Sequence, residues 1–362
     1  MKVDLHFPRQ ILDSVVGGRS AIDIPRLEIQ NLEQAHGFAK TYGYDLGDPV
    51  DLEEVWSFHR RTISFLREKV LEQGELIPEE LSDPYKLKDP ANLLMYASEA
   101  TVKGNLRQNW SCAILRVMHA LAHLEDDLFK VFTDQIRDTI LRPFQSHLSS
   151  DPTAGIVLGH KSDTDQIKLK SFEIKPAKSD ASAVMKLLAK PEATSMGILD
   201  KMGVRLVTRS MFDVFRVVRF LVDQHIISFP NVIPDQSRNN LYPVNLFLEA
   251  VNELRMTNSD PDPGDVDRLL QQKLSESLDR AEYKEKRNEF SGSNYRSIKF
   301  IARRLIEIDQ PHHFHFFFPY EVQIMDYETY LKNLSGPEAH EQYKKRQREA
   351  VRRRVLSFLY KE

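Results

Sequence analysis

Two acidic residues in apolar surroundings are the part of this sequence best suited to chemistry. Asp200 lies at the start of an apolar, β-prone run, and Glu321 lies inside another such run much later in the chain. A strand can hold a carboxylate rigidly, and two carboxylates supply the hard oxygen ligands that Mg²⁺ prefers. The alternative is that each acid is neutralised by a salt bridge, Asp200 with Arg205 or Glu321 with a lysine.

A second group of residues has the spacing of an anion site. Lys178, Ser182 and Lys186 are four residues apart, so they share one face at the start of a predicted helix. A helix N-terminus adds backbone N–H groups and a positive dipole end, both of which favour phosphate. The alternative is an ordinary solvent-exposed lysine face.

Tyr295 offers an aromatic ring near the second acid. It follows Gly292-Ser293-Asn294, a turn-forming sequence that would leave the ring accessible. Stacking a nucleobase on such a ring contributes about 1–3 kcal/mol. An ordinary edge-strand tyrosine is the competing interpretation.

The elements that must hold these residues follow from hydrophobic periodicity. Residues 1–150 are predicted to be mostly helical, with amphipathic helices at 52–73 and 110–132. Residues 165–235 alternate as strand, helix, strand, helix and strand (167–174, 179–189, 198–208, 212–225 and 226–233), which predicts an α/β core. Strands return at 296–308 and 313–325, and a basic helix is predicted at about 337–360. We therefore expect an α-helical domain (1–150) and a second domain (151–362) with a helical insertion at about 241–290.

The composition excludes several classes of protein. A net charge of −3 gives no overall positive field that would draw the chain to nucleic acid or to an anionic membrane. Cys112 is the only cysteine, which rules out an internal disulfide and suits a reducing cytoplasm. No stretch approaches the roughly 18 apolar residues of a membrane span. We expect a cytoplasmic protein without a membrane segment.

Five short motifs follow one another in a particular order. They are Lys178-x-x-x-Ser182-x-x-x-Lys186, Asp200 to Arg205, Asn294 to Ile298, Glu321 to Ile324, and His340-x-x-Tyr343-Lys344. In this order they resemble the motifs of the RelA/SpoT-type (p)ppGpp synthetase domain. The resemblance spans about residues 165–348, apart from the insertion.

The resemblance implies an α+β fold of the polymerase-β-like nucleotidyltransferase type, with a mixed, mostly antiparallel five-stranded sheet and flanking helices. It also implies transfer of the β,γ-diphosphate of ATP to the 3′-hydroxyl of GDP, GTP or a related acceptor. Asp200 and Glu321 would be catalytic and hold Mg²⁺, Tyr295 would stack the acceptor base, and Arg205 would pack on adenine. The residues implied to bind the nucleotides are Lys175, Lys178, Ser182, Lys186, Arg205, Tyr295, Arg296, Lys299, Gln323 and His340.

The chain departs from the family pattern directly after two of the motifs, Asn294 to Ile298 and Glu321 to Ile324. Lys299 stands where the family carries a histidine, and Met325-Asp326 stands where it carries Arg-Thr. These departures leave a second hypothesis open, a catalytically degenerate domain that binds nucleotide or RNA as a regulator. The basic C-terminal helix would then be the RNA contact. The sequence does not determine the oligomeric state, and a homo-oligomer is one of the states it allows.

Overall fold

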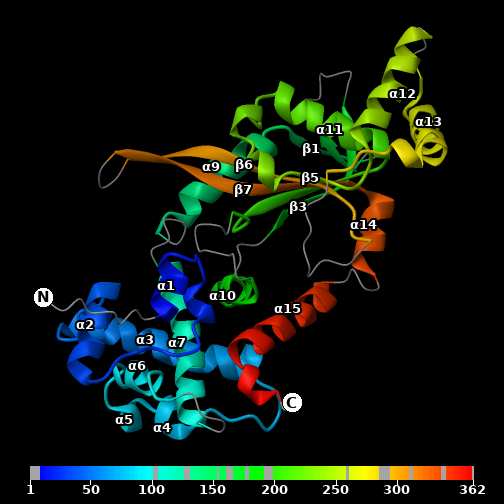
Figure 1. Ribbon diagram of the computed structural model, residues 1–362. Coiled ribbons are helices and arrows are strands. Elements are labelled where there is room, and N and C mark those ends of the chain that lie inside the picture. The colour runs from blue at the N-terminus through cyan, green and yellow to red at the C-terminus, as the bar shows by residue number, and fades with distance from the viewer. Residues whose placement is uncertain are drawn as a thin grey trace, which may run out of the picture. The chain divides into compact units, whose positions relative to one another are not determined.

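A computed structural model describes residues 9–100, 105–125, 131–152, 155–159, 166–175, 179–190, 199–257, 261–284, 294–309, 313–335 and 340–360. The chain forms two compact units, each built from separate segments (Figure 1). The helical unit comprises Met1–Asp127, Ser179–Ile198 and Lys344–Glu362, and the sheet unit comprises Leu128–Lys178 and Leu199–Tyr343. The predicted domains, 1–150 and 151–362, are continuous stretches instead.

The helical unit is organised around α7 (Leu106–Glu125). This helix packs against α3 (Pro49–Phe65), α6 (Asn92–Tyr96) and α10 (Asp180–Ala189). Apolar side chains at helical spacing make these contacts, as the sequence pattern predicts. The other helices are α1 (Arg9–Val15), α2 (Leu32–Tyr42), α4 (Glu79–Ser82), α5 (Pro84–Leu87) and most of α15 (His340–Val355).

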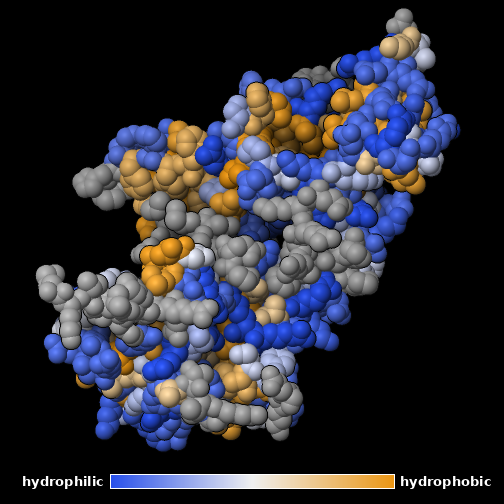
Figure 2. Space-filling view, in the orientation of Figure 1, coloured by the Kyte–Doolittle hydropathy of each residue, from blue (hydrophilic) through white to orange (hydrophobic). Residues whose placement is uncertain are grey.

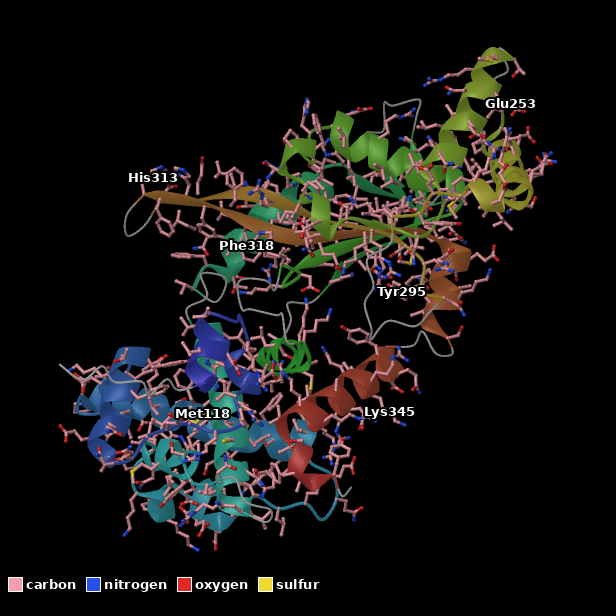
Figure 3. All side chains as sticks on the ribbon, viewed as in Figure 1. Met118, Glu253, Tyr295, His313, Phe318 and Lys345 are labelled. Atoms are coloured by element: carbon pink, nitrogen blue, oxygen red, sulfur yellow. The ribbon has the colours of Figure 1, made fainter. Side chains whose placement is uncertain are left out.

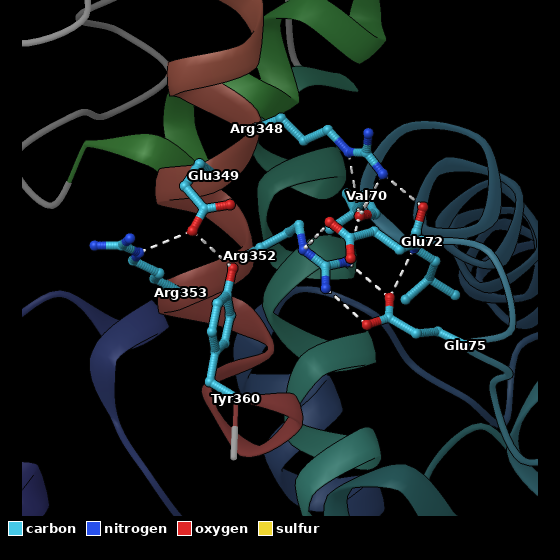
Figure 4. A network of polar contacts seen from close by, with 9 residues as sticks. Val70, Glu72, Glu75, Arg348, Glu349, Arg352, Arg353 and Tyr360 are labelled. Atoms are coloured by element: carbon cyan, nitrogen blue, oxygen red, sulfur yellow. Dashed lines mark hydrogen bonds and ion pairs between the residues drawn. The ribbon is translucent and has the colours of Figure 1, made fainter. Parts of the chain in front are cut away.

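Arginines of α15 fasten the C-terminal helix to this unit (Figure 4). After α3 the chain makes a π-helical turn, Leu66–Val70, whose last carbonyl groups lack helical partners. Arg348 donates to the carbonyl of Leu71 at 2.7 Å, and Arg352 donates to the carbonyl of Val70 at 2.8 Å. Arg352 also meets both oxygens of Glu75, each at 2.7 Å.

These contacts limit the prediction that the basic C-terminal helix contacts RNA. The side chains of Arg352 and Arg354 are only 6% and 11% exposed, and Arg354 pairs with Asp23. They are neither a solvated helix surface nor available to a ligand, because buried arginines pair with carboxylates and carbonyls. Lys344 and Lys345 are exposed, so an RNA contact through these two lysines stays a prediction.

A seven-stranded mixed sheet forms the second unit, in the order β1-β2-β3-β4-β7-β6-β5. Its strands are β1 (Leu148–Asp151), β2 (Gly155–Leu158), β3 (Ile167–Lys175), β4 (Gly203–Thr208), β5 (Arg238–Asn239), β6 (Ile298–Ile308) and β7 (Phe314–Asp326). Among the described strands, only β4 and β7 pair in parallel, so the sheet is mostly antiparallel, as predicted. The expected count of five strands is wrong: β1, β2 and β5 were not predicted, and these strands have only two to four residues.

One predicted strand is absent from the sheet. Residues 226–233 contain the short 3₁₀ helix Phe229–Asn231, and Val232 makes only an isolated bridge to Ala302. Pro230 and Pro234 explain the difference, because proline has no N–H to donate to a neighbouring strand.

Helices cover one face of the sheet. The core contains apolar residues of α9 (Thr133–Gln145) and α11 (Met211–Asp223) together with strand residues such as Val204, Leu206, Val322 and Ile324. Because strand side chains alternate, the neighbouring residues Arg205, Glu321 and Gln323 belong to the opposite face. A short helix, α14 (Tyr327–Leu334), follows β7 and packs near this edge.

The predicted helical insertion is confirmed as α12 (Val244–Met256) and α13 (Pro263–Glu276). The two helices pack on Phe212 and Phe215 of α11. They therefore lie on the side of the sheet opposite to Glu321, and on the face shown in Figure 2 their surface is mainly hydrophilic. Among the described residues, no helix combines the length and apolar character needed to span a bilayer.

Candidate functional site

The register of the central strands brings distant residues into two rows on the polar face. In one row Lys175 of β3 pairs with Gly203 of β4, and Gly203 pairs with Glu321 of β7. In the next row Glu173, Arg205, Gln323 and Lys299 follow one another across β3, β4, β7 and β6. Sheet pairing thus collects polar side chains from three separate parts of the sequence.

Glu321 is the centre of this cluster. Its side chain is 6% exposed, and one carboxylate oxygen meets the ammonium group of Lys175 while the other meets that of Lys299. The salt-bridge alternative of the sequence analysis is therefore confirmed for Glu321, with two lysines rather than one. Each lysine side chain stays partly exposed, at 26% and 35%, although burial acts strongly on both ammonium groups.

The charges around Glu321 decide its protonation. Burial alone would raise the pKa of this carboxyl, but Lys299 and Lys175 outweigh burial and lower the pKa to about 2. Burial lowers the pKa of Lys175, and the positive charges of Lys299 and Arg205 lower it further. The pKa of Lys299 is raised, because the charges of Glu321 and Asp200 outweigh the effect of burial. Around neutral pH the carboxylate is charged.

Asp200 lies close enough to act on the same cluster. Its negative charge raises the pKa of Lys299 and opposes the ionisation of Glu321. It precedes β4 rather than opening it, since the strand begins at Gly203 and not at the expected residue 198. A turn rather than a strand therefore carries the first acid.

Gly203 allows β4 to approach β7 closely at this point. A Cβ atom at this position would lie 2.8 Å from the carbonyl oxygen of Glu321 and 3.0 Å from its Cβ. Any larger residue would push against the backbone that carries Glu321. The close approach of β4 and β7 therefore requires glycine at position 203.

Gln323 connects the acid cluster to an aromatic ring. Its amide oxygen accepts from Arg205 Nε at 3.1 Å, and its amide nitrogen donates to the hydroxyl of Tyr295. Arg205 also pairs with Glu173 at 3.0 Å and lies 5.8 Å from the ring centre of Tyr330 on α14. Gln323, Glu173 and Tyr330 thus fix the position of the Arg205 guanidinium. Because its charge is already paired with Glu173, this guanidinium is better suited to stack on a ligand than to form an ion pair with it.

The backbone around Tyr295 is fixed by two buried asparagines. Asn240 donates to the carbonyl of Tyr295 at 2.7 Å and accepts from the N–H of Ser297 at 3.0 Å. Asn333 of α14 donates to the carbonyl of Arg296 at 2.8 Å and accepts from its N–H at 3.1 Å. Figure 3 shows Tyr295 beside α14 at this edge of the sheet. The ring is half-buried, so it is less accessible than the turn sequence predicts.

Other residues predicted for the site lie in the helical unit or outside the described residues. Lys178 lies outside the described residues. Ser182 and Lys186 lie on α10, which belongs to the helical unit, and Ser182 N–H is capped by the Ser179 side chain. His340 begins α15, and its side chain is outside the described part of the chain. The structure therefore assembles Lys175, Asp200, Arg205, Tyr295, Arg296, Lys299, Glu321 and Gln323 within the sheet unit.

The two residues that replace the family's Arg-Thr have structural roles here. Met325 is fully buried in the sheet core. Asp326 begins α14 as its N-cap and accepts from the backbone N–H and the hydroxyl of Thr329, at 3.1 and 2.6 Å. Neither side chain is available to a nucleotide.

Three residues of this site were missed in the sequence. Glu173 lies two positions before Lys175 on the same strand, so the period of two could have found it. Asn240 and Asn333 carry no local signal, because their role depends on which backbone segment the fold places beside them.

Comparison with known proteins adds two structural likenesses. No protein-family model and no curated protein matches the chain. The small alarmone synthetase 1 from Bacillus subtilis superimposes with a TM-score of 0.29 at 12% identity, over 64% of this chain and 93% of that protein. The same synthetase bound to its product pppGpp gives a TM-score of 0.25 at 11% identity, over 62% and 93%. TM-scores this low do not establish a shared fold.

Proposed function

We propose that the protein is a Mg²⁺-dependent nucleotide pyrophosphokinase that transfers the β,γ-diphosphate of ATP to the 3′-hydroxyl of a guanine or other nucleotide. The observation that carries the proposal is the cluster in which Lys175 and Lys299 share the buried carboxylate of Glu321, with Asp200 beside them. Phosphoryl-type transfer needs charge neutralisation and positioning more than covalent help, and this cluster supplies both signs of charge.

The two lysines are suited to bind the transferred phosphates. Each lysine side chain is partly exposed, so a phosphate can approach it from solvent without dismantling the sheet. Lysine binds phosphate as a mobile point charge, and its long side chain can turn from Glu321 to a ligand. The phosphates of ATP would therefore bind Lys175 and Lys299 first. The two oxygens of Glu321 would then be available to other partners.

Asp200 and Glu321 fit a magnesium ion only together with the nucleotide. Two carboxylates and two lysines make the cluster neutral, so a lone divalent cation would meet two ammonium groups beside its ligands. Mg²⁺ commonly binds through one or two carboxylates plus substrate phosphates. Once bound it would neutralise charge on the transferring group.

The acceptor nucleotide would lie beside Tyr295. The fixed backbone at Tyr295 and Ser297 holds the ring near Gln323, and Glu321, two residues before Gln323 on the same strand face, would take the 3′-hydroxyl proton. In the transfer the 3′-oxygen forms a bond to the β-phosphorus, the bond between the α- and β-phosphates breaks, and AMP leaves.

A second candidate function is nucleotide binding without turnover. Two ammonium groups on Glu321 make it a weak base, and Met325 and Asp326 have structural roles instead of contacting a ligand. Such a domain would act as a nucleotide-dependent regulator.

One assay separates these two functions. Purified protein is incubated with Mg²⁺, γ-labelled ATP and GDP, GTP or AMP, and products are resolved by anion-exchange chromatography. A labelled product with AMP released in equal amount supports transfer, and Asp200→Asn should abolish it while Asp265→Asn, an exposed acid on α13, should not. Nucleotide binding by calorimetry without any product supports the second candidate. Absence of both binding and product contradicts both.

The metal proposal has its own test. Calorimetric titration with MgCl₂ should show no binding to the protein alone and clear binding when a nonhydrolysable ATP analogue is present. Tight binding of Mg²⁺ to the nucleotide-free protein would show that the lysines do not block the carboxylates.

A further inference from the structure

The helical unit contains a partly open cavity of about 320 Å³. Apolar side chains of α2, α3, α6 and α7 form most of its wall, including Ala39, Val55, Leu94 and Leu115. All lining residues belong to Met1–Asp127, so the cavity lies within one compact unit and is independent of the site around Glu321. Met118, which Figure 3 labels on α7, also lines it.

The size of this cavity indicates a ligand. Protein interiors are close-packed and leave few voids larger than a water molecule. An engineered apolar cavity of about 150 Å³ stays dry and takes up benzene, and the cavity here is about twice as large. Pockets for small molecules begin at roughly this volume.

A route from solvent runs along α2. Phe38 and Tyr42 both line the cavity, and they are 44% and 41% exposed. Two aromatic side chains that reach both the cavity and solvent form a natural entrance, because ring rotation opens it without moving the backbone.

Arg116 gives the apolar cavity one cationic end. Its guanidinium donates to the carbonyl groups of Ile24 and Val355, at 3.0 and 3.3 Å, while its buried Nε has no acceptor within the described residues. A buried donor without a partner is costly, and a ligand acceptor would satisfy it. The charge makes a carboxylate the preferred acceptor.

The second polar group of the wall is uncharged. Tyr42 and His119 share a hydrogen bond of 2.7 Å between the hydroxyl and Nδ1, and the ring of His119 packs at 4.3 Å on that of His123. Burial, together with the charge of His123, lowers the pKa of His119 to about 4, so the pair is neutral around neutral pH. Arg116 is then the charged group that faces the cavity.

We propose that this cavity binds a small apolar carboxylic acid, with its hydrocarbon or aromatic body against α2, α6 and α7 and its carboxylate at Arg116. This is a second ligand site, in a different unit from the proposed nucleotide site.

The test is calorimetric titration of the intact protein with decanoate and, as the uncharged match, with decan-1-ol. Decanoate should bind with one-to-one stoichiometry and at least tenfold more tightly than the alcohol. Ala39→Leu places extra carbon atoms in the cavity and should weaken decanoate binding at least tenfold. Gly37→Ala is the matched control on α2, since a Cβ there meets nothing within 4 Å, and it should leave binding unchanged.

A charge variant tests the assigned head group. Arg116→Gln should bring decanoate down to the affinity of the alcohol, whereas Arg107→Gln, on the exposed part of α7, should not. If Arg116→Gln does not fold, the acid-against-alcohol comparison and Ala39→Leu still decide. Equal binding of acid and alcohol would overturn the carboxylate assignment. No binding, or binding that Ala39→Leu leaves intact, would overturn the site.

Discussion

Two ion-pair clusters in this molecule have opposite designs. Around Arg352 one guanidinium meets both oxygens of Glu75, a third acid oxygen from Glu72 and a backbone carbonyl. Around Glu321 one carboxylate meets two lysines, each through a single contact. Both terminal nitrogens of the arginine donate to fixed partners, whereas the lysines keep donors to spare.

The difference separates a structural ion pair from a candidate binding site. A planar guanidinium in a bidentate pair locks two backbone segments in one geometry. Lysines that share a carboxylate can exchange it for another anion at low cost, because the ammonium group has no preferred direction. We therefore expect substitutions at the first cluster to change stability and those at the second to change activity.

The largest effect is expected at Glu321. Under the proposed function, Glu321→Gln would remove both a metal ligand and the proton acceptor, so transfer from ATP should fall about 10³-fold or more. The measurement is product formation at saturating nucleotide, with circular dichroism to confirm that the variant is folded. A folded variant with wild-type turnover would contradict the role of this carboxylate.

Arg352→Ala should lower the free energy of unfolding of the helical unit. Any activity of the folded protein should stay intact. Removing one member of a buried ion pair leaves an unpaired charge and costs about 3–5 kcal/mol in the free energy of unfolding. Urea unfolding measures it. Arg353→Ala is the matched control, because Arg353 is 73% exposed and its pair with Glu349 should contribute less than about 1 kcal/mol. Equal losses in the two variants would refute the distinction.

A smaller effect is expected at the asparagine that holds the Tyr295 segment. Asn240→Ala removes the hydrogen bonds to the carbonyl of Tyr295 and from the N–H of Ser297. Two such bonds contribute about 1.4 kcal/mol, so the KM for the acceptor nucleotide should rise about tenfold. Steady-state kinetics with varied acceptor measures it. Asn245→Ala, on α12, should leave KM unchanged. A change in the ATP KM alone would place Tyr295 at the donor instead.

The smallest effect concerns pH. The hydrogen bond from Arg352 is the main cause that lowers the pKa of Glu75 in the folded protein. A lowered carboxyl pKa stabilises the fold above the unfolded value of about 4.3, and this contribution is lost as pH falls through the folded pKa. The stability gap between wild type and Glu75→Gln near neutral pH should therefore begin to shrink as the pH falls below about 4.3, and it should be lost below the folded pKa. A gap that persists at the acid end would exclude the ion pair as its source.

Long, strongly patterned elements were predictable from the sequence. The strand at 167–174, the helices at 179–189 and 212–225 and the two long strands at 296–308 and 313–325 occur within a few residues of their expected bounds. Each has an apolar pattern of one period over most of its length, which one packing environment explains. The strands β1, β2 and β5 were missed because two to four residues are too few to show a period.

The site was predictable as a set of residue types but not as a set of contacts. The two acids and Tyr295 could be chosen from their neighbours in sequence. That Lys175 and Lys299 share one carboxylate depends on the register of β3, β4, β6 and β7, which no local pattern fixes. Ser182 and Lys186 show the reverse case, since good helical spacing did not reveal which unit their helix belongs to.

The bond between Arg352 and Glu75 joins residues 277 positions apart, and the same guanidinium donates to Val70 at the end of the π-helical turn after α3. At about 5–20 residues per second, a ribosome needs roughly 14–55 s to travel from one partner to the other. During that interval the early helices exist without the guanidinium groups that cover their final carbonyls. Completion of the helical unit therefore waits until Arg352 has been synthesised, and a ribosome stalled before Arg352 should present those helices to proteases.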